Sequence, residues 1–405
     1  MEKKTSIFTN GIIWFGVAIS VSEIECGIEI GAANTPDGLW LPLILGHVLG
    51  GVMLYFVGLI GARVRLNAME TTASTFGKYG SKFFASLNLL QLIGWIAVLN
   101  AQGALALAGL NLPISFPVTC VILAVLIAGW VALGLRRTEK ITTVVMSLLA
   151  VLLVVLTAKF FGLGEAMSSG AASVVGAVTA AVSDGSASLP TFNFWTVFEI
   201  SIAMPLSWLP VISDYTKDAE RPTAATAISA VAYTIASLWM YFIGLQIAGL
   251  GVGTNIAQAI LLAGIGIPGI LIVALSTVTT NFLAANSAGE SAKAIVNKLN
   301  PKVTGVVVCA LSTVLAIWGI VDHYIHFLYM IASVFAPMAA VLLVSFFFVK
   351  EHLEQKGFWV WNLFAWLAGF VVYQVAVTTG FEAVGPTLLA VVISAALTFA
   401  AKIKK

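Results

Sequence analysis

The chain consists of long apolar stretches separated by short polar breaks. A helix needs about 20 mostly apolar residues to cross a bilayer, and twelve stretches meet this requirement. They lie at about 11–33, 39–62, 83–110, 115–135, 141–162, 193–213, 224–250, 264–286, 303–321, 324–349, 357–379 and 383–402. We number them spans one to twelve. The pattern predicts an all-α integral membrane protein with twelve transmembrane helices.

Composition excludes a soluble protein. Of the 405 residues, 60% are hydrophobic and only 9% are charged, whereas a soluble domain carries about 25% charged residues. The three cysteines lie in apolar runs, the four histidines follow no metal-binding spacing, and no phosphate-binding glycine loop occurs. We therefore expect the lipid bilayer as a partner, but no nucleic acid, no cofactor and no ATP site. No removable signal peptide is expected either.

Basic residues predict the orientation. With the N-terminus inside, 19 of the 20 lysines and arginines fall on the inner side, and only Lys159 falls elsewhere. Under the positive-inside rule both termini are cytoplasmic. We expect one domain, residues 1–405, in the inner (plasma) membrane, and the oligomeric state stays open.

A long loop at about 163–192 divides the first five spans from the next five. Because five is odd, the two groups run in opposite directions, as in an inverted-topology repeat. The predicted repeats are 11–162 and 193–349, followed by two additional helices in 357–402. Matching signals for a broken helix occur in span one, at Gly16–Gly31, and in span six, at Pro205 and Pro210.

Span one carries Glu23, Glu25 and Glu29 in an otherwise apolar run. A carboxylate within a bilayer is costly and usually functional. Together with the glycines, these residues predict a helix that unwinds near Ser20–Glu23 and lines a polar cavity, as in a transporter. The alternatives are that the glycines only permit close packing and that Glu29 is merely solvated near the outer interface.

Unwinding of span one would expose backbone carbonyls. Those of Gly16 and Ile19 would then face a cation, and the side chains of Ser20 and Glu23 would face a substrate. Span eight offers the opposing ligands, since Ser276, Thr279 and Thr280 follow helical spacing. Their hydroxyls suit a hard monovalent cation. The alternative is that they bond back to carbonyls of their own helix.

Polar side chains in spans three, six and eight complete the candidate site. In span six, Ser207 and Trp208 lie between two prolines, where a flat ring could stack and hydrogen-bond. In span three, Gln91 suits an aminopyrimidine edge and Trp95 offers a ring face. Asn281, with Asn286 as a second candidate, could face the cavity from span eight. The alternatives are a kinked packing helix around Trp208 and interhelical bonding by Gln91.

These segments resemble the nucleobase–cation symporter family, which includes the cytosine and hydantoin permeases. Within it, the chain looks most like hydroxymethylpyrimidine permeases linked to uptake of a thiamine precursor. The resemblance covers all twelve spans. It rests on Thr279-Thr280-Asn281, on the Gly16 to Ile19 step, on Gly94-Trp95, and on Ser207 seven residues before Asp214.

The resemblance implies a LeuT-like 5+5 inverted repeat with broken spans one and six. It implies sodium ligands at Gly16, Ile19, Ser276, Thr279 and Thr280. It implies contacts to a planar substrate from Ser20, Gln91, Trp95, Ser207 and Asn281.

The chain departs from cytosine permeases in two respects. They carry aromatic residues at the positions of Ser20 and Pro205, so Trp95 or Trp208 is expected to supply the stacking ring. They also lack the acidic residues at 23 and 25, and a carboxylate can accept from an exocyclic amine and a protonated ring nitrogen. We therefore expect a small aminopyrimidine, hydroxymethylpyrimidine rather than cytosine. Its amine is the expected donor to Glu23, with Gln91 or a bound cation as alternatives.

The leading hypothesis is a sodium-coupled importer of a small aminopyrimidine that works by alternating access. A proton-coupled purine, pyrimidine or hydantoin permease of the same fold, with Glu23 or Glu25 as proton carrier, is the alternative. An enzyme would need a nucleophile–base pair or a metal cluster, and the spans contain neither. A channel would need a filter-like loop, and none occurs in the sequence.

Overall fold

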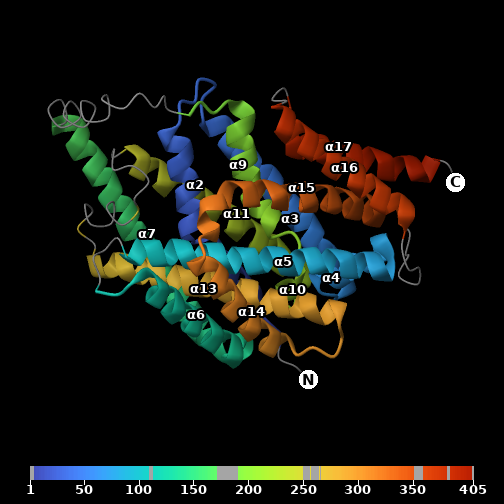
Figure 1. The fold of residues 1–405 in the computed structure, drawn as a ribbon, viewed down its shortest axis with the longest axis horizontal. Helices are drawn as coiled ribbons and strands as arrows, with labels where there is room; N and C mark the ends of the chain where they lie inside the picture. Colours follow the sequence, from blue (N-terminus) through green and yellow to red (C-terminus); the bar gives the residue numbers. More distant parts are fainter. Residues whose placement is uncertain are drawn as a thin grey trace.

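The computed structural model describes residues 4–108, 113–170, 190–249, 256, 264, 266–350, 359–380 and 384–403. The elements of the described part of the chain are helices (Figure 1). The helices are α1 (Ile7–Ala18), α2 (Val21–Ala32), α3 (Trp40–Val64), α4 (Ala68–Thr71), α5 (Ala73–Ala108), α6 (Phe116–Leu133), α7 (Leu135–Gly170), α9 (Phe194–Ser207), α10 (Ile212–Thr216), α11 (Pro222–Gly249), α13 (Gly266–Ile295), α14 (Pro301–Ile317), α15 (Tyr324–Val344), α16 (Val360–Thr379) and α17 (Pro386–Ile403). A 3-10 turn, Ile320–His323, precedes α15, and a π turn, Ser345–Val349, follows it.

The described part of the chain contains eight helices long and apolar enough to cross a membrane. The number is nine if α1 and α2, which meet at a bend of 49°, form one span. Three shorter apolar helices are Thr143–Lys159, Pro301–Ile317 and Pro386–Ala401. The all-helical membrane fold is therefore confirmed, and the count of twelve spans stays a prediction.

The helices pack as two groups. One contains α1 and α2 with α3, α9, α10 and α11, and the other contains α5, α6, α13 and α14. The helix pairings are equivalent in the two halves of the chain. Helix α2 of the first half packs on α11 of the second, and its counterpart α9 packs on α3. Likewise α5 packs on α14, and its counterpart α13 packs on α6. An inverted repeat would produce such an exchange of partners. We therefore keep the repeat of 11–162 and 193–349 as our interpretation, with α16 and α17 together at one edge (Figure 1).

Helix α7 differs from the sequence prediction at both ends. The predicted break at Arg136–Lys140 lies inside the helix, because Gly134, at a φ of 80°, makes the whole turn by itself. Arginine, glutamate and lysine are good helix formers, so the helix starts directly after it. The predicted loop at 163–192 begins with residues that continue α7 to Gly170. Residues 171–189 of that loop lie outside the described residues.

Three segments predicted to be cytoplasmic meet at one end of the molecule. The Arg65 guanidinium donates to the carbonyl oxygens of Lys217 and Ala219, at 2.8 and 2.7 Å. Thr5, near the N-terminus, pairs with the same loop through Asp218 and Glu220. Meeting at one end is what the basic-residue pattern requires of these segments.

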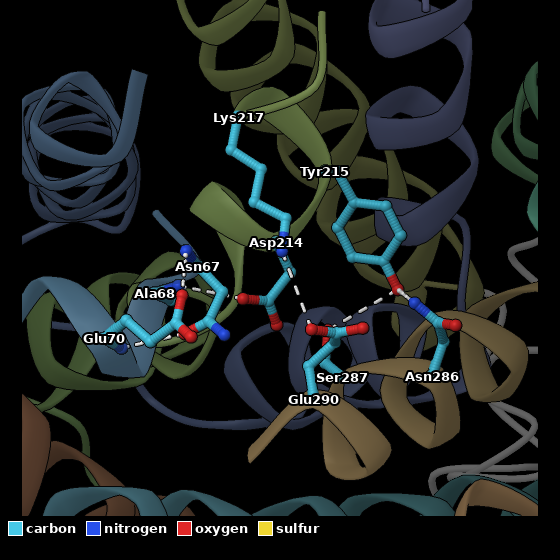
Figure 2. Close-up of polar contacts among 9 residues, drawn as sticks. All are labelled: Asn67, Ala68, Glu70, Asp214, Tyr215, Lys217, Asn286, Ser287 and Glu290. Carbon is cyan, nitrogen blue, oxygen red and sulfur yellow. Dashed lines mark hydrogen bonds and ion pairs between the residues drawn. The ribbon is translucent and has the colours of Figure 1, made fainter. Parts of the chain in front are cut away.

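The contacts that hold this end together surround α10 (Figure 2). The Asp214 carboxylate accepts from the backbone N–H of Ala68 at 2.9 Å, which ties α10 to α4. Lys217 forms an ion pair with Glu290 of α13 at 3.6 Å. Between them, the Tyr215 hydroxyl donates to the carbonyl oxygen of Leu283 at 2.8 Å. The second half of span six is therefore anchored to two different parts of the fold.

Candidate functional site

Helix α1 stops in the middle of the first span. Ile19 donates its N–H to the carbonyl oxygen of Gly16 at 3.2 Å, and Ser20 caps α2 by accepting from the N–H of Glu23 at 3.3 Å. The interruption is thus Ile19–Ser20, shorter than the predicted Ser20–Glu23, because Glu23 already lies in the first turn of α2. A helix end inside the fold leaves carbonyl groups without an intrahelical donor.

Helix α13 contributes hydroxyl groups beside this interruption. Thr280 Oγ1 donates to the carbonyl oxygen of Val17 at 3.2 Å and so joins α13 to the end of α1. Ser276 and Thr279 donate instead to carbonyls of their own helix, as the alternative interpretation of their spacing anticipated. Each hydroxyl oxygen can still accept or bind a cation. Ser276 also lines a cavity of about 20 Å³ together with Ile19 and Ser20, otherwise walled by apolar residues.

Span six is interrupted between its prolines. Helix α9 ends at Ser207, residues 208–211 form turns, and α10 starts at Ile212. The Ser207 hydroxyl donates to the carbonyl oxygen of Met204 at 2.7 Å. The Trp208 ring is buried and lies edge-on to Trp14, with ring centroids 5.9 Å apart. Helix α1 is therefore in contact with the interruption of span six through these indole rings.

Side-chain amides of α5 hold the irregular backbone of span six. Gln91 Nε2 donates to the carbonyl oxygen of Ser207 at 3.1 Å, and Asn88 Nδ2 donates to that of Pro210 at 3.0 Å. Gln91 thus acts in part as the interhelical contact considered from the sequence. Its Oε1 atom is buried and has no hydrogen-bond partner among the described residues, so it keeps a free acceptor.

Further buried polar atoms lack partners on the helices that enclose the interruptions. In the described part of the chain these include both amide atoms of Asn281, the Oδ1 atom of Asn100 and the indole N–H groups of Trp14 and Trp95. Asn281 has no exposed surface. Native proteins pair the large majority of such atoms, so a concentration of unpaired ones on α1, α5 and α13 points to a polar ligand. The Trp95 ring packs edge-on against Tyr324 and Phe327.

The structure gives the Glu23 carboxylate two donors that the sequence analysis did not identify. Tyr233 donates to Oε1 at 2.8 Å and Ser237 to Oε2 at 2.7 Å, both from one face of α11. The expected donors were the substrate, Gln91 or a cation. The Ser237 hydroxyl also contacts Nε2 of His47, at 2.8 Å. His47 follows no metal-binding spacing in the sequence, but as an ionisable residue inside the apolar span two it carries the same functional signal as Glu23.

The other intramembrane carboxylates have separate surroundings. Gln102 donates to Glu25 and accepts from Ser22. Glu25 and the half-buried Glu29 line a cavity of about 440 Å³ with Asp322 and His326, consistent with a solvated Glu29.

Glu199 belongs to α9, and its carboxylate contacts the first turn of α17. One carboxylate oxygen accepts from the N–H of Thr387 at 2.9 Å and the other from its hydroxyl at 2.7 Å. It therefore satisfies an N–H group at a helix start. This contact ties the second predicted repeat to the C-terminal helices.

The family model and the curated relatives that match the chain agree on one family. Residues 2–358 match the family described as permease for cytosine/purines, uracil, thiamine, allantoin. The cytosine permease of Escherichia coli strain K12 is 21% identical over 347 residues, which is 85% of this chain and 78% of that protein. The cytosine permease of E. coli O157:H7 is 20% identical over the same length.

Solved structures share the fold. Mhp1, a nucleobase-cation-symport-1 family transporter, closed with bromovinylhydantoin bound, superposes with a TM-score of 0.72 at 18% identity, covering 98% of this chain and 92% of that one. Its inward-facing form gives 0.74 at 17% identity, covering 99% and 91%. A Na⁺-coupled sialic acid symporter in a substrate-bound outward-open state gives 0.71 at 15% identity, covering 99% and 89%.

Proposed function

Because the chain belongs to the nucleobase–cation symporter family of permeases, and is a transporter and not an enzyme, we propose that it imports a small aminopyrimidine with sodium as the coupling ion. Hydroxymethylpyrimidine, a thiamine precursor, is the proposed substrate, with cytosine as the nearest alternative. The observation that carries the proposal is the set of buried amide and indole groups on α1, α5 and α13 that have no hydrogen-bond partner in the described part of the chain. Contacts of Trp14, Gln91 and Thr280 bring these helices against the two interrupted spans.

The chemistry of these groups suits an aminopyrimidine. Asn281 offers a donor and an acceptor side by side, which match a ring nitrogen and the adjacent exocyclic amine. Gln91 Oε1 adds an acceptor. The rings of Trp95 and Trp208 supply aromatic faces, and Ser20 and Ser207 border the interruptions. In this proposal Glu23 acts on the substrate through its donors Tyr233 and Ser237, since both carboxylate oxygens are already bonded.

Sodium is proposed to bind where α13 meets the end of α1. The carbonyl groups of Gly16 and Ile19 and the hydroxyls of Ser276, Thr279 and Thr280 would be its ligands, an all-oxygen set that suits a hard cation. The contact between Thr280 and Val17 supports this placement because it brings span eight against the interruption of span one. Ion and substrate would then share span one and affect each other's binding.

The proposed orientation has both termini in the cytoplasm of the cell and the protein in the inner (plasma) membrane. It is supported by the meeting of the N-terminal segment, Arg65 and the loop after α10 at one end. The segments around Asn34 and Phe192, predicted to be outside, pair at the start of α9 and hence at the other end of span six.

Uptake into proteoliposomes tests the proposal. Hydroxymethylpyrimidine, cytosine, uracil, hydantoin and thiamine are each offered with and without an inward sodium gradient at fixed pH. We expect accumulation of the aminopyrimidines, hydroxymethylpyrimidine above all, and only with sodium. Accumulation of uracil or hydantoin in preference to both aminopyrimidines would reject the substrate, and accumulation independent of sodium would reject the coupling ion.

Thr280→Ala is expected to raise the sodium concentration for half-maximal uptake roughly tenfold, a loss of about 1.4 kcal/mol in ion affinity. The reason is that Thr280 reaches span one, at Val17, and would supply a ligand. Thr313→Ala is the matched control, since Thr313 donates to its own helix at Cys309. Equal sodium dependence in Thr280→Ala and the parent would leave Thr280 with a packing role only.

A further inference from the structure

A chain of five buried polar side chains crosses the first group of helices. It runs from Tyr233 to Glu23, on to Ser237, then to His47 and finally to Ser201. The contacts measure 2.8, 2.7, 2.8 and 2.6 Å in that order. Glu23 is 2% exposed, and His47, Ser237 and Ser201 are not exposed at all. An ionised group in such a place requires a partner of opposite charge or neutralisation by a proton.

Hydrogen atoms can be assigned along this chain because each serine has only one to donate. Ser201 donates to the carbonyl oxygen of Leu43 at 2.5 Å, so the contact between His47 Nδ1 and Ser201 needs a hydrogen on Nδ1. If Ser237 donates to an ionised Glu23, the contact between Nε2 and Ser237 needs a hydrogen on Nε2. Both ring nitrogens are then protonated. The result is an imidazolium and a carboxylate bridged by one serine.

A second assignment satisfies the same contacts with the same number of protons. The Glu23 carboxyl group gives its hydrogen to Ser237, Ser237 donates to Nε2, and the imidazole is neutral. The two assignments interconvert when the carboxyl proton passes to the Ser237 oxygen while the serine passes its own hydrogen to Nε2. One O–H bond is broken at Glu23 and one N–H bond is formed at His47, with no net gain or loss.

Removing one proton breaks the pattern. A neutral imidazole beside an ionised carboxylate leaves one hydrogen too few. Either the single hydrogen of the Ser237 hydroxyl must be donated to both Glu23 and His47, or that of the Ser201 hydroxyl must be donated to both His47 Nδ1 and the Leu43 carbonyl oxygen. A close polar contact without a hydrogen is repulsive and costs about as much as an unmade buried hydrogen bond. The geometry therefore favours the state that contains the additional proton.

We propose that Glu23, Ser237 and His47 form a proton-binding unit that holds one proton shared between the carboxylate and the imidazole. The proposal rests on the assignment of the chain as a transporter, because the unit then gives the transport cycle a proton-binding site separate from the proposed sodium ligands. Its connection to the substrate is Tyr233, whose ring packs edge-on against Trp14 at 6.1 Å and beside Trp208 at 6.5 Å.

Other titratable groups near the unit do not supply a charge or a hydrogen to Glu23 or His47 in place of this proton. Among the described residues no lysine or arginine contacts Glu23 or His47. The Tyr241 ring lies edge-on to His47 at 4.6 Å, and its hydroxyl donates to the carbonyl oxygen of Ile200. The remaining groups on packed helices have their own partners: Cys26 contacts Tyr324, Glu25 contacts Gln102, Glu199 contacts Thr387, Asp214 contacts Ala68, and Glu70 contacts Asn67.

The first measurement uses the parent protein without substrate. Nitrogen NMR of ring-labelled histidine in lipid nanodiscs distinguishes imidazolium from neutral imidazole, and infrared spectra report a protonated carboxyl group. His47→Gln and Glu23→Gln assign the signals. At pH 7 we expect either the imidazolium of His47 or the carboxylic acid of Glu23. A neutral imidazole together with an ionised carboxylate would overturn the proposal. This result does not depend on uptake, so it can fail while the proposed function holds, and the reverse is also true.

The second measurement is the pH profile of sodium-driven uptake in Ser237→Ala. Without the bridging hydroxyl the protonated state loses both of its bridging hydrogen bonds, so the proton is released more easily. We expect the upper pH midpoint of uptake to fall by about one pH unit, a tenfold weaker hold on the proton. Ser237→Thr, which keeps the hydroxyl, should restore the parent profile. Ser229→Ala is the control, because Ser229 is buried on the same helix and has no hydrogen-bond partner in the described part of the chain. An identical profile for Ser237→Ala and the parent would contradict a role of the unit in transport.

Discussion

Asn281→Ala is expected to weaken substrate binding roughly 30- to 150-fold, the loss of two hydrogen bonds worth about 1–1.5 kcal/mol each. Both amide atoms of Asn281 are buried without a partner in the described structure, so the proposed substrate supplies their only bonds. The stability of the protein should change little, because alanine removes two unpaired polar atoms. Binding of labelled hydroxymethylpyrimidine to purified protein in saturating sodium measures the effect.

Asn286→Ala is the matched control on the same helix. The Asn286 amide donates to the Tyr215 hydroxyl at 3.4 Å, in the cluster at the end of α10 (Figure 2). It is thus engaged away from the unpaired groups, and its substitution should leave substrate affinity within about threefold of the parent, a difference of under 1 kcal/mol. Should Asn281→Ala bind as tightly as Asn286→Ala, the unpaired amide is not a substrate contact.

Gly244→Ala is expected to lower the free energy of unfolding by about 1–3 kcal/mol, the usual cost of overpacking a tight interface. A Cβ atom at this position would lie 2.1 Å from the carbonyl oxygen of Ile24, and one at Gly27 would lie 2.2 Å from that of Tyr241. Both clashes are with backbone, so no flexible side chain can move away. Helices α2 and α11 would have to separate, which also draws Tyr233 and Ser237 away from Glu23.

Thermal unfolding in detergent checks this expectation. Gly249→Ala is the control, since Gly249 ends the same helix and a Cβ there would meet no atom of the described residues within 4 Å. It should melt with the parent or slightly above it, because alanine restricts the unfolded chain. If Gly244→Ala unfolds at the same temperature as Gly249→Ala, the close approach of α2 and α11 does not exist in solution.

Much of the fold could be predicted from the sequence because a bilayer imposes local rules. Helix length, apolar composition and turn residues are properties of single segments. They gave the all-helical membrane fold and the turn at Lys298–Pro301, where Asn300 caps α14. The same local rules gave a wrong start for α7. They predicted a polar break at Arg136–Lys140, but these residues are helical because the chain already turns at Gly134. The family resemblance drawn from Thr279-Thr280-Asn281 is confirmed by the family match.

The sequence by itself determined which side chains are costly in a membrane and therefore need an explanation, Glu23, Gln91 and Asn281 among them. Only the tertiary structure decided which hydrogen-bond partners these buried side chains have. The Glu23 carboxylate accepts hydrogen bonds from two residues of α11, more than 200 positions further along the chain. The Gln91 side-chain amide donates to the backbone of span six. Asn281 stays unpaired among the described residues. Burial is a property of a residue and its segment, whereas a hydrogen bond needs two groups within about 3 Å, and which distant groups meet depends on how the helices pack.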